Sequence, residues 1–252
     1  MSTMNNEQLY VEGVLSSKAV IQANKRDVLK VLISQKKFSR DIAYLIKLAK
    51  ERDIEVEFCA VDQLDAISES KAHGGVLALV GERTYDKLES VLKHKEPFIA
   101  LLEGIEDPFN FGYCLRSLHA AGCNGVIVGR RNWSDVVNVV TKSSAGASEY
   151  MNVIVSDNFT ETIQHIKAQG NISVVGANRK DATNLYTTNL DGGLLLLIGG
   201  EKRGLSSKVA NLADKNIYIP YANDFKNAIN GSSATAIISF EVFRRRGKFN
   251  AK

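Results

Sequence analysis

The chain has 252 residues, a length that suits either one large α/β domain or two smaller ones, and 44% of them are hydrophobic, which is ample for a buried core. The net charge of +4 is too small an excess to indicate an anionic partner by itself. No apolar run reaches the ~18 residues that a membrane helix requires, and residues 1–7 lack the basic start and apolar core of a secretion signal. We therefore expect a flexible N-terminus at these residues and a cytoplasmic protein with no membrane partner.

The first part of the chain alternates between helical and strand patterns. In chain order these patterns predict helix 19–23, strand 28–33, helix 39–52, strand 56–61, helix 62–68 and strand 76–80. The clearest pattern is that of helix 39–52, because Ser39 is a suitable N-cap and apolar residues follow it at helical spacing. The result is a compact α/β unit near the lower limit of domain size.

Residues 84–97 are a polar and charged connection that is helical at most, and Pro97 leads out of it into a new strand. Beyond this connection, the patterns predict strands at 98–102, 125–128, 153–155, 172–177, 194–198 and 217–219, and helices at 110–121, 134–143 and 234–246. Continuous apolar runs such as 194–198 indicate strands that are buried on both faces, as in a parallel sheet covered by helices. We therefore predict a second α/β domain with a mostly parallel sheet.

The cysteines and histidines do not form a pattern that binds metal. Cys59, Cys114 and Cys123 each lie in apolar surroundings and lack CxxC spacing, so we expect buried free thiols rather than a disulfide framework or a zinc site. None of the four histidines clusters with them in the sequence. We therefore predict no metal.

Positive charge is concentrated in two places. Six basic residues crowd into residues 25–40, and Arg244, Arg245 and Arg246 with Lys248 close the chain. These segments are either solvated surfaces or the footprint of an anionic partner such as RNA. Trp133 follows two arginines, and a packing role is more typical of such a residue than base stacking.

The most informative segment is a glycine-rich turn that follows the apolar run 194–198 directly. The turn contains Gly199, Gly200 and Gly204, and a second short strand, 217–219, follows. Such turns leave backbone N–H and C=O groups bare at the carboxyl ends of parallel strands, where α/β sheets bind small ligands. Bare backbone suits a nucleoside-like ligand, because amide groups can recognise an adenine edge without a charged side chain.

Three segments of the second half resemble the three motifs of the SpoU (TrmH-like) branch of the SPOUT RNA methyltransferases. They are LEGIEDPFNFGYCLRS at 102–117, IGGEKRGL at 198–205, and Ile219-Pro220 followed by NGSSA at 230–234 and Phe240-Glu241. Their order and separation also match, and the likeness covers residues 98–246. The first half, with YVEG at 10–13 and HGGVLA at 73–78, resembles the L30e-like RNA-binding domain of many members. The resemblance therefore implies an L30e-like substrate-binding domain at 8–83, a linker at 84–97 and a SPOUT methyltransferase domain at 98–252.

This resemblance implies an enzyme that transfers a methyl group from S-adenosylmethionine to a ribose 2′-OH of RNA. It also implies a C-terminal trefoil knot and a homodimer whose active site takes residues from both chains. Matching the motifs residue by residue gives cofactor-binding positions at Gly199, Gly200, Glu201, Gly204, Ile219 and Ile229. Because an L30e-like domain is commonest in members that act on large-subunit ribosomal RNA, 23S ribosomal RNA is the expected substrate.

Four polar residues are the candidates for the chemistry: Arg116, Asn110, Asn230 and Ser232. The guanidinium of Arg116 suits electrostatic stabilisation of a developing alkoxide better than proton abstraction, because its pKa lies above ~12. The two asparagines offer donors and acceptors for a ribose hydroxyl, and Ser232 matches the serine of the third motif. Ala228, Gly231 and Ser233 depart from the family's usual residues in this loop, and the gap between Pro220 and Asn230 is longer by about one residue.

Each of these residues also has a purely structural interpretation. Arg116 could pair with Glu103 or Glu106, and Asn110 and Ser232 could be ordinary helix caps. Transfer RNA is the alternative substrate, and a non-catalytic RNA-binding protein on the same fold is the alternative function, although loss of Arg116 or of the glycine turn would have favoured it. A nucleotide-dependent oxidoreductase is disfavoured, because no GxGxxG follows the first strand of either half.

Overall fold

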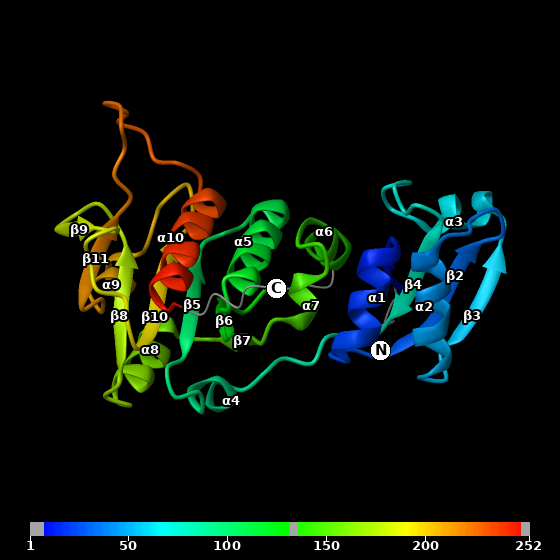
Figure 1. Ribbon diagram of the computed structural model, residues 1–252, viewed down its shortest axis with the longest axis horizontal. Helices are drawn as coiled ribbons and strands as arrows, with labels where there is room; N and C mark the ends of the chain where they lie inside the picture. Colours follow the sequence, from blue (N-terminus) through cyan, green and yellow to red (C-terminus); the bar gives the residue numbers. More distant parts are fainter. Residues whose placement is uncertain (1–7, 132–135, 248–252) are drawn as a thin grey trace, which may run out of the picture. The chain divides into compact units, whose positions relative to one another are not determined.

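The computed structural model describes residues 8–131 and 136–247, which form two compact units (Figure 1). The first unit combines residues up to 84 with residues 136–150, and the second combines residues 85–131 with residues from 151 onward. Trp133, Lys248 and the first two residues of the predicted helix 134–143 lie outside the described residues. No described helix is long and apolar enough to cross a membrane.

The first unit contains a four-stranded sheet in the order β1-β4-β2-β3. Its strands are β1 (Leu9–Glu12), β2 (Val28–Ser34), β3 (Glu55–Cys59) and β4 (Val76–Val80). β4 pairs with β1 and β2 in antiparallel fashion, whereas β2 and β3 are parallel and are connected by a helix. Its helices are α1 (Val14–Ala23), α2 (Arg40–Lys50), α3 (Val61–Ile67), α6 (Val137–Ser143) and α7 (Ala147–Tyr150).

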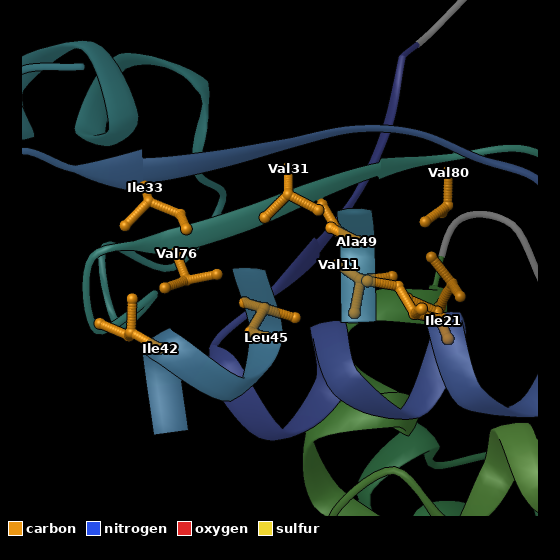
Figure 2. Close-up of a cluster of buried hydrophobic side chains, with 12 residues drawn as sticks. Val11, Ile21, Val31, Ile33, Ile42, Leu45, Ala49, Val76 and Val80 are labelled. Carbon is orange, nitrogen blue, oxygen red and sulfur yellow. The ribbon is translucent and has the colours of Figure 1, made fainter. Parts of the chain in front are cut away.

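Helix α2 forms where its sequence pattern predicts it. The Ser39 side chain accepts a hydrogen bond from the backbone N–H of Ile42 at 3.1 Å, which satisfies one of the free donors at the helix start. Ile42, Leu45 and Ala49 then recur on one face of the helix and are buried (Figure 2). They pack in a cluster with apolar residues of the sheet, including Val31 and Ile33 of β2. This cluster is the core of the first unit.

A buried ion pair joins the segment 136–150 to the rest of the first unit. The guanidinium of Arg26 donates to both carboxylate oxygens of Glu149, at 3.0 and 3.1 Å, and Arg83 lies 3.6 Å from the same carboxylate. The side chains of Arg26 and Glu149 are 5% and 1% exposed. Nearby, Gly146 has a positive φ and lies so close to α1 that a Cβ would come within 2.6 Å of the Ala19 side chain. A side chain at position 146 would therefore push α7 away from α1.

The second unit contains a seven-stranded sheet in the order β7-β6-β5-β10-β8-β11-β9. Its strands are β5 (Phe98–Glu103), β6 (Gly125–Gly129), β7 (Val153–Ser156), β8 (Ile172–Ala177), β9 (Ala182–Asn184), β10 (Gly193–Gly199) and β11 (Lys215–Tyr218). All described pairs of neighbouring strands in it are parallel, as the buried apolar runs predict. Its helices are α4 (Leu88–Leu92), α5 (Pro108–Ala120), α8 (Phe159–Lys167), α9 (Ser207–Ala210) and α10 (Gly231–Arg245).

Both faces of the central strand β10 are covered. Leu195 and Leu197 pack in a cluster with Ile163 and Ile166 of α8, whereas the alternating residues are buried on the opposite face, where α10 contacts β10 and packs against α5. Parallel strands expose their carboxyl ends at one edge, so β5, β8, β10 and β11 all end on the same side of the sheet. The knot stays a prediction that is compatible with this arrangement.

Several elements differ from the sequence prediction. The predicted strand 56–61 ends at Cys59, because Gln63 accepts a hydrogen bond from the Ala60 N–H at 2.9 Å and starts α3 there. The final helix begins at Gly231 rather than at 234, because the Asn230 side chain caps it through the N–H of Ser233 at 2.8 Å. The sequence patterns do not predict the elements β1, α7, α8, α9 and β9.

Candidate functional site

A cavity of about 580 Å³ lies at the carboxyl ends of β8, β10 and β11, within the second unit. Its walls come from these strand ends, from the connection between β11 and α10, and from the first turns of α10. All six positions that the resemblance assigns to the cofactor line it: Gly199, Gly200, Glu201, Gly204, Ile219 and Ile229. Asn230 also lines it, whereas Asn110, Arg116 and Ser232 do not.

The glycine turn brings two backbone segments into direct contact. A Cβ on Gly200 would lie 1.9 Å from the carbonyl oxygen of Gly104, which follows β5. A Cβ on Gly199 would lie 2.2 Å from the backbone of Gly204 and Leu205. Gly204 itself has φ of +63°, in the left-handed region that favours glycine. The floor of the cavity is therefore backbone, and no other residue type fits at positions 199 and 200.

The connection between β11 and α10, drawn orange in Figure 1, lines the cavity and is fixed by two side chains that are not among the predicted site residues. The hydroxyl of Tyr221 accepts a hydrogen bond from the N–H of Ile229 at 3.0 Å. The guanidinium of Arg179 donates to the carbonyls of Lys226 and Asn227 at 3.0 and 3.1 Å and lies 4.8 Å from the centre of the Tyr221 ring. No local pattern marks Arg179, because its partners lie far along the chain. The position of Tyr221 directly after Ile219-Pro220 was a usable signal.

Polar side chains from three segments form one hydrogen-bonded network beside the cavity. Asn110 of α5 donates to the carboxylate of Glu201 at 2.9 Å, and its carbonyl oxygen accepts from the hydroxyl of Ser232 at 3.5 Å. The Ser232 hydroxyl also lies 3.2 Å from the carbonyl oxygen of Asn230. The fold thus brings together residues of all three motifs. The cap of α5 is Asp107, whose carboxylate accepts from the Asn110 N–H at 2.8 Å, so Asn110 is not the cap.

Arg116 stands apart from this network. It lies on α5, its side chain is exposed, and within the described chain it has no hydrogen-bond or ion-pair partner. The pairing with Glu103 or Glu106 that the sequence allowed is not found. Glu103 instead accepts from the N–H of Ser206 at 2.8 Å, and Glu106 lies 3.4 Å from Lys202. The guanidinium of Arg116 therefore remains available to a ligand.

The arginines at 244–246 are engaged by internal partners. Arg244 and Arg245 both pair with Glu241 at 2.7 Å, and these contacts lower the pKa of that carboxyl. Arg246 donates to the carbonyls of Glu96 and Gly192 at 3.0 and 2.7 Å. The arginine run at the chain end is therefore mainly a structural feature of the second unit.

The three cysteines are free and buried, as predicted. Burial raises the pKa of the Cys114 thiol to about 11, and this thiol packs between α5 and α10, 3.4 Å from the hydroxyl of Thr235. Among the described residues, no group of three or more histidine, cysteine, aspartate or glutamate side chains is arranged to hold a metal ion.

Two family models match the chain. The SpoU rRNA Methylase family matches residues 97–240, and the model named RNA 2'-O ribose methyltransferase substrate binding matches residues 10–86. The first match contains the first two motifs, the third motif up to Phe240, and the whole cavity lining. The second contains both glycine motifs of the first unit.

Individual proteins resemble the chain over nearly its full length. A protein of Staphylococcus aureus (strain COL), described as a TrmH family tRNA/rRNA methyltransferase, is 32% identical over 86% of this chain and 88% of its own. The 23S rRNA (guanosine-2'-O-)-methyltransferase RlmB of Shewanella oneidensis is 28% identical over 95% of this chain and 98% of its own. The solved structure of the SpoU methyltransferase AviRb from Streptomyces viridochromogenes, in complex with AdoMet, has a TM-score of 0.79 at 23% identity and covers 96% of this chain and 92% of its own. The chain therefore belongs to the SpoU (TrmH-like) family of RNA methyltransferases.

Proposed function

We propose that the protein transfers a methyl group from S-adenosylmethionine to a ribose 2′-OH of 23S ribosomal RNA. The observation that carries this proposal is the cavity at the edge of the sheet, whose floor is formed by backbone atoms. The hydrogen-bonded network of Asn110, Glu201, Ser232 and Asn230 lies beside it. Relatives named for RNA methylation match over both units, and RlmB, named for 23S rRNA, matches 95% of the chain. The broader name of the Staphylococcus aureus relative makes transfer RNA the second candidate substrate.

The residues of the cavity fit S-adenosylmethionine. Its volume of about 580 Å³ lies within the range of small-molecule sites. Ile198, Ile217 and Ile219 supply apolar walls for a nucleoside, and the glycine floor leaves backbone groups to recognise a base edge. Glu201 is the carboxylate on the lining, and it suits a cationic ligand. The cofactor, when bound, supplies an electrophilic methyl group.

The polar network has the chemistry to hold the accepting hydroxyl. The Asn110 amide and the Ser232 hydroxyl are fixed by each other and by Glu201, so they can orient a ribose oxygen without first ordering themselves. Positioning of this kind is worth up to ~7–11 kcal/mol of a reaction barrier. We assign Arg116 to stabilisation of the alkoxide that develops as the 2′-OH loses its proton to water or to a phosphate of the substrate, because a free guanidinium gives up its proton too rarely to act as a base.

Because Arg116 does not line the cavity of its own chain, we place its action in a homodimer. Phe109 lies two turns before Arg116 on α5 and Tyr113 lies one turn before it, and the two residues are 53% and 46% exposed. A stripe of two large aromatic residues beside an unpaired cation suits a surface that a second copy covers. In that arrangement Arg116 of one chain stabilises the alkoxide that forms beside the cavity of the other chain.

Two measurements test the proposal. Calorimetric titration with S-adenosylmethionine and, separately, with NADH should give binding only for the first, and a preference for NADH would contradict the assigned cofactor. Mass mapping of ribosomal RNA from cells with and without the protein should then reveal one ribose methyl that depends on it. Cofactor binding with unchanged ribosomal RNA and one missing methyl in transfer RNA would instead support the second substrate.

A further inference from the structure

The loop between β2 and α2 carries the most exposed large hydrophobic side chain among the described residues. This side chain is Phe38, which is 86% exposed. The loop comprises residues 35–39 and follows the carboxyl end of β2. A phenylalanine that is almost fully exposed to water contributes almost nothing to the stability of the fold, because its ring buries almost no surface. Its position is therefore better explained by a ligand than by folding.

Unpaired positive charge lies on both sides of Phe38 in the sequence. Lys36, Lys37 and Arg40 are exposed, and none of them has an ion-pair partner in the described ranges. Other members of the basic segment 25–40 are engaged elsewhere: Lys30 pairs with Glu55 and Glu57 at 3.0 and 2.9 Å, and Arg26 is buried against Glu149.

The nearest carboxylate in the sequence is also neutralised. Asp41 follows Arg40 directly and pairs with Lys18 at 2.7 Å. The free positive charge of the segment is thus concentrated on the three residues that flank Phe38. We call Lys36, Lys37, Phe38 and Arg40 the loop patch.

The loop is held in place by its backbone. The N–H of Gln35 donates to the carbonyl of Cys59 at 3.0 Å, and the N–H of Lys37 donates to the carbonyl of Ser34 at 3.0 Å. Ser39 then caps α2. A Cβ on Gly75 would lie 2.7 Å from the Lys37 side chain, so the glycine lets this lysine pack across the end of β4. A rigid loop presents Phe38 to a ligand at low entropic cost.

The two glycine motifs of the first unit meet at the same end of its sheet. The N–H of Gly13 donates to the carbonyl of Val76 at 2.9 Å. The N–H of Gly75 donates to the Nδ1 atom of His73 at 3.0 Å, and the Nε2 atom of this buried ring lies 2.9 Å from Asp65. The carbonyl of Gly75 accepts from Ser34 at the start of the loop. The glycine motif at 73–78 therefore lies beside the loop patch, and the motif at 10–13 is hydrogen-bonded to this glycine motif.

We propose that Phe38 stacks on an unpaired base of the RNA substrate while Lys36, Lys37 and Arg40 contact the flanking phosphates. Aromatic rings beside cations are the usual means by which proteins bind single-stranded RNA, because every base has a stacking face and every linkage a negative charge. The inference rests on the proposed function in taking RNA as the ligand, and it assigns a loop or bulge, rather than a continuous duplex, to the first unit.

A fluorescence titration of the full chain tests the stacking contact directly. Trp133 is the only tryptophan, so Phe38→Trp in a Trp133→Phe background provides a single reporter at the proposed contact. The probes are an RNA hairpin with an unpaired loop and a blunt RNA duplex with the same stem. The hairpin should quench the reporter strongly, and the duplex should quench it weakly. Equal quenching by both probes, or by neither, would overturn the proposal.

Matched variants separate stacking from charge. Phe38→Ala should weaken binding of the hairpin by roughly five- to a hundredfold, and Phe38→Tyr should retain it. The control for apolar exposure is Leu29→Ala, at the opposite end of β2, where the side chain is 58% exposed. Lys36→Gln with Arg40→Gln should lower the salt dependence of binding, whereas Lys50→Gln at the far end of α2 should leave it unchanged.

Two further measurements distinguish failure of the stacking contact from failure of the proposed function. Phe38→Ala should bind S-adenosylmethionine like the unmodified chain, because the cavity belongs to the second unit. If the unmodified chain fails to bind S-adenosylmethionine but the hairpin still quenches the reporter, the proposed function fails and the stacking contact stands. Quenching by phosphatidylserine vesicles and not by the hairpin would replace RNA with a membrane surface and overturn the inference.

Discussion

At the scale of single residues, the contact between Gly200 and Gly104 determines whether the cavity can form. The carbonyl oxygen of Gly104 lies 1.9 Å from the place where a side chain at position 200 would begin. Gly200→Ala must therefore separate the ends of β5 and β10, and we expect a loss of about 1–3 kcal/mol of stability together with loss of cofactor binding. Thermal unfolding and calorimetric titration with S-adenosylmethionine measure the two effects.

The matched control for this substitution is Gly129→Ala at the end of β6. A Cβ there would lie 3.5 Å from the ring of Phe159, which is an ordinary contact. This variant should therefore retain both stability and binding. If Gly200→Ala binds the cofactor as well as Gly129→Ala does, the cavity is not the cofactor site.

Arg116 allows a test of catalysis that leaves the cavity intact. Arg116→Lys keeps the positive charge but loses the planar fork of donors that matches a phosphate or an alkoxide. Because Arg116 does not line the cavity, we expect cofactor affinity to be unchanged and methyl transfer to RNA to fall at least about tenfold. Near-normal turnover measured with radiolabelled methyl groups would remove Arg116 from the mechanism.

At the scale of elements, Glu12 connects β1 to two other segments of the first unit. Its side chain is 1% exposed, and its carboxylate accepts from the N–H of Glu69 at 3.0 Å, from the Ser70 hydroxyl, and from Lys142 of α6 at 3.0 Å. Burial alone would raise its pKa, but these hydrogen bonds outweigh burial and lower the pKa to about 2. The charged form of Glu12 therefore stabilises the fold.

The pH dependence of this contribution follows from the direction of the shift. Since the pKa of folded Glu12 lies below the ordinary value of 4.5, its stabilisation is complete above pH 4.5 and is lost as the pH falls toward 2. We expect Glu12→Gln to be less stable than the unmodified chain at neutral pH, with a difference that shrinks as the pH falls through this window. Urea denaturation at a series of pH values measures it, and a difference that stays constant with pH would contradict the assignment.

The elements that the sequence predicts are those whose signals are local. Helix α2 has its cap at Ser39 and its apolar face within a few turns, and β10 is a continuous apolar run, so both could be predicted directly. The strand β9 could not, because its three residues have no apolar pattern and form a strand by pairing with β11, which is distant in the sequence. Helix α8 contains Thr160 and Thr162, which favour helix weakly, and it is stabilised by packing of its apolar face on the sheet.

The residues of the candidate site also divide into those with a local sequence signal and those without one. The glycine turn and the motif residues could be located from the sequence, because their spacing along the chain resembles a known family. The clamp that Arg179 places on the carbonyls of Lys226 and Asn227 could not, because it depends on folding of segments that are distant in the chain. The position of Arg116 outside the cavity is also a property of the fold, since a motif gives neighbours in sequence and not the direction of a side chain.

At the scale of the whole molecule, the first unit is discontinuous in sequence, and the ion pair between Arg26 and Glu149 joins its two segments. Both side chains are buried, so removal of one charge leaves the other without compensation. We expect Glu149→Gln to destabilise the first unit by about 3–5 kcal/mol, measured by chemical denaturation. Glu89→Gln, at an exposed position of the second unit, is the control and should have little effect.

A fragment of residues 1–84 tests the same feature without a substitution. It lacks Glu149 and the helices α6 and α7, so the guanidinium of Arg26 loses the carboxylate that neutralises it. We expect this fragment to lose cooperative thermal unfolding, as followed by circular dichroism. A fragment that unfolds cooperatively at the temperature of the full chain would show that the ion pair is dispensable.

The strand order of the second unit has a consequence for synthesis of the protein. β5 is the first strand of its sheet to leave the ribosome, whereas its neighbour β10 follows only after β6, β7, β8 and β9. One side of β5 must therefore remain without its hydrogen-bonding neighbour until these intervening strands have been made. Pairings between distant segments form slowly, and bare strand edges attract one another. Newly made chains of this protein should accordingly depend on chaperones during translation more than their finished stability would indicate.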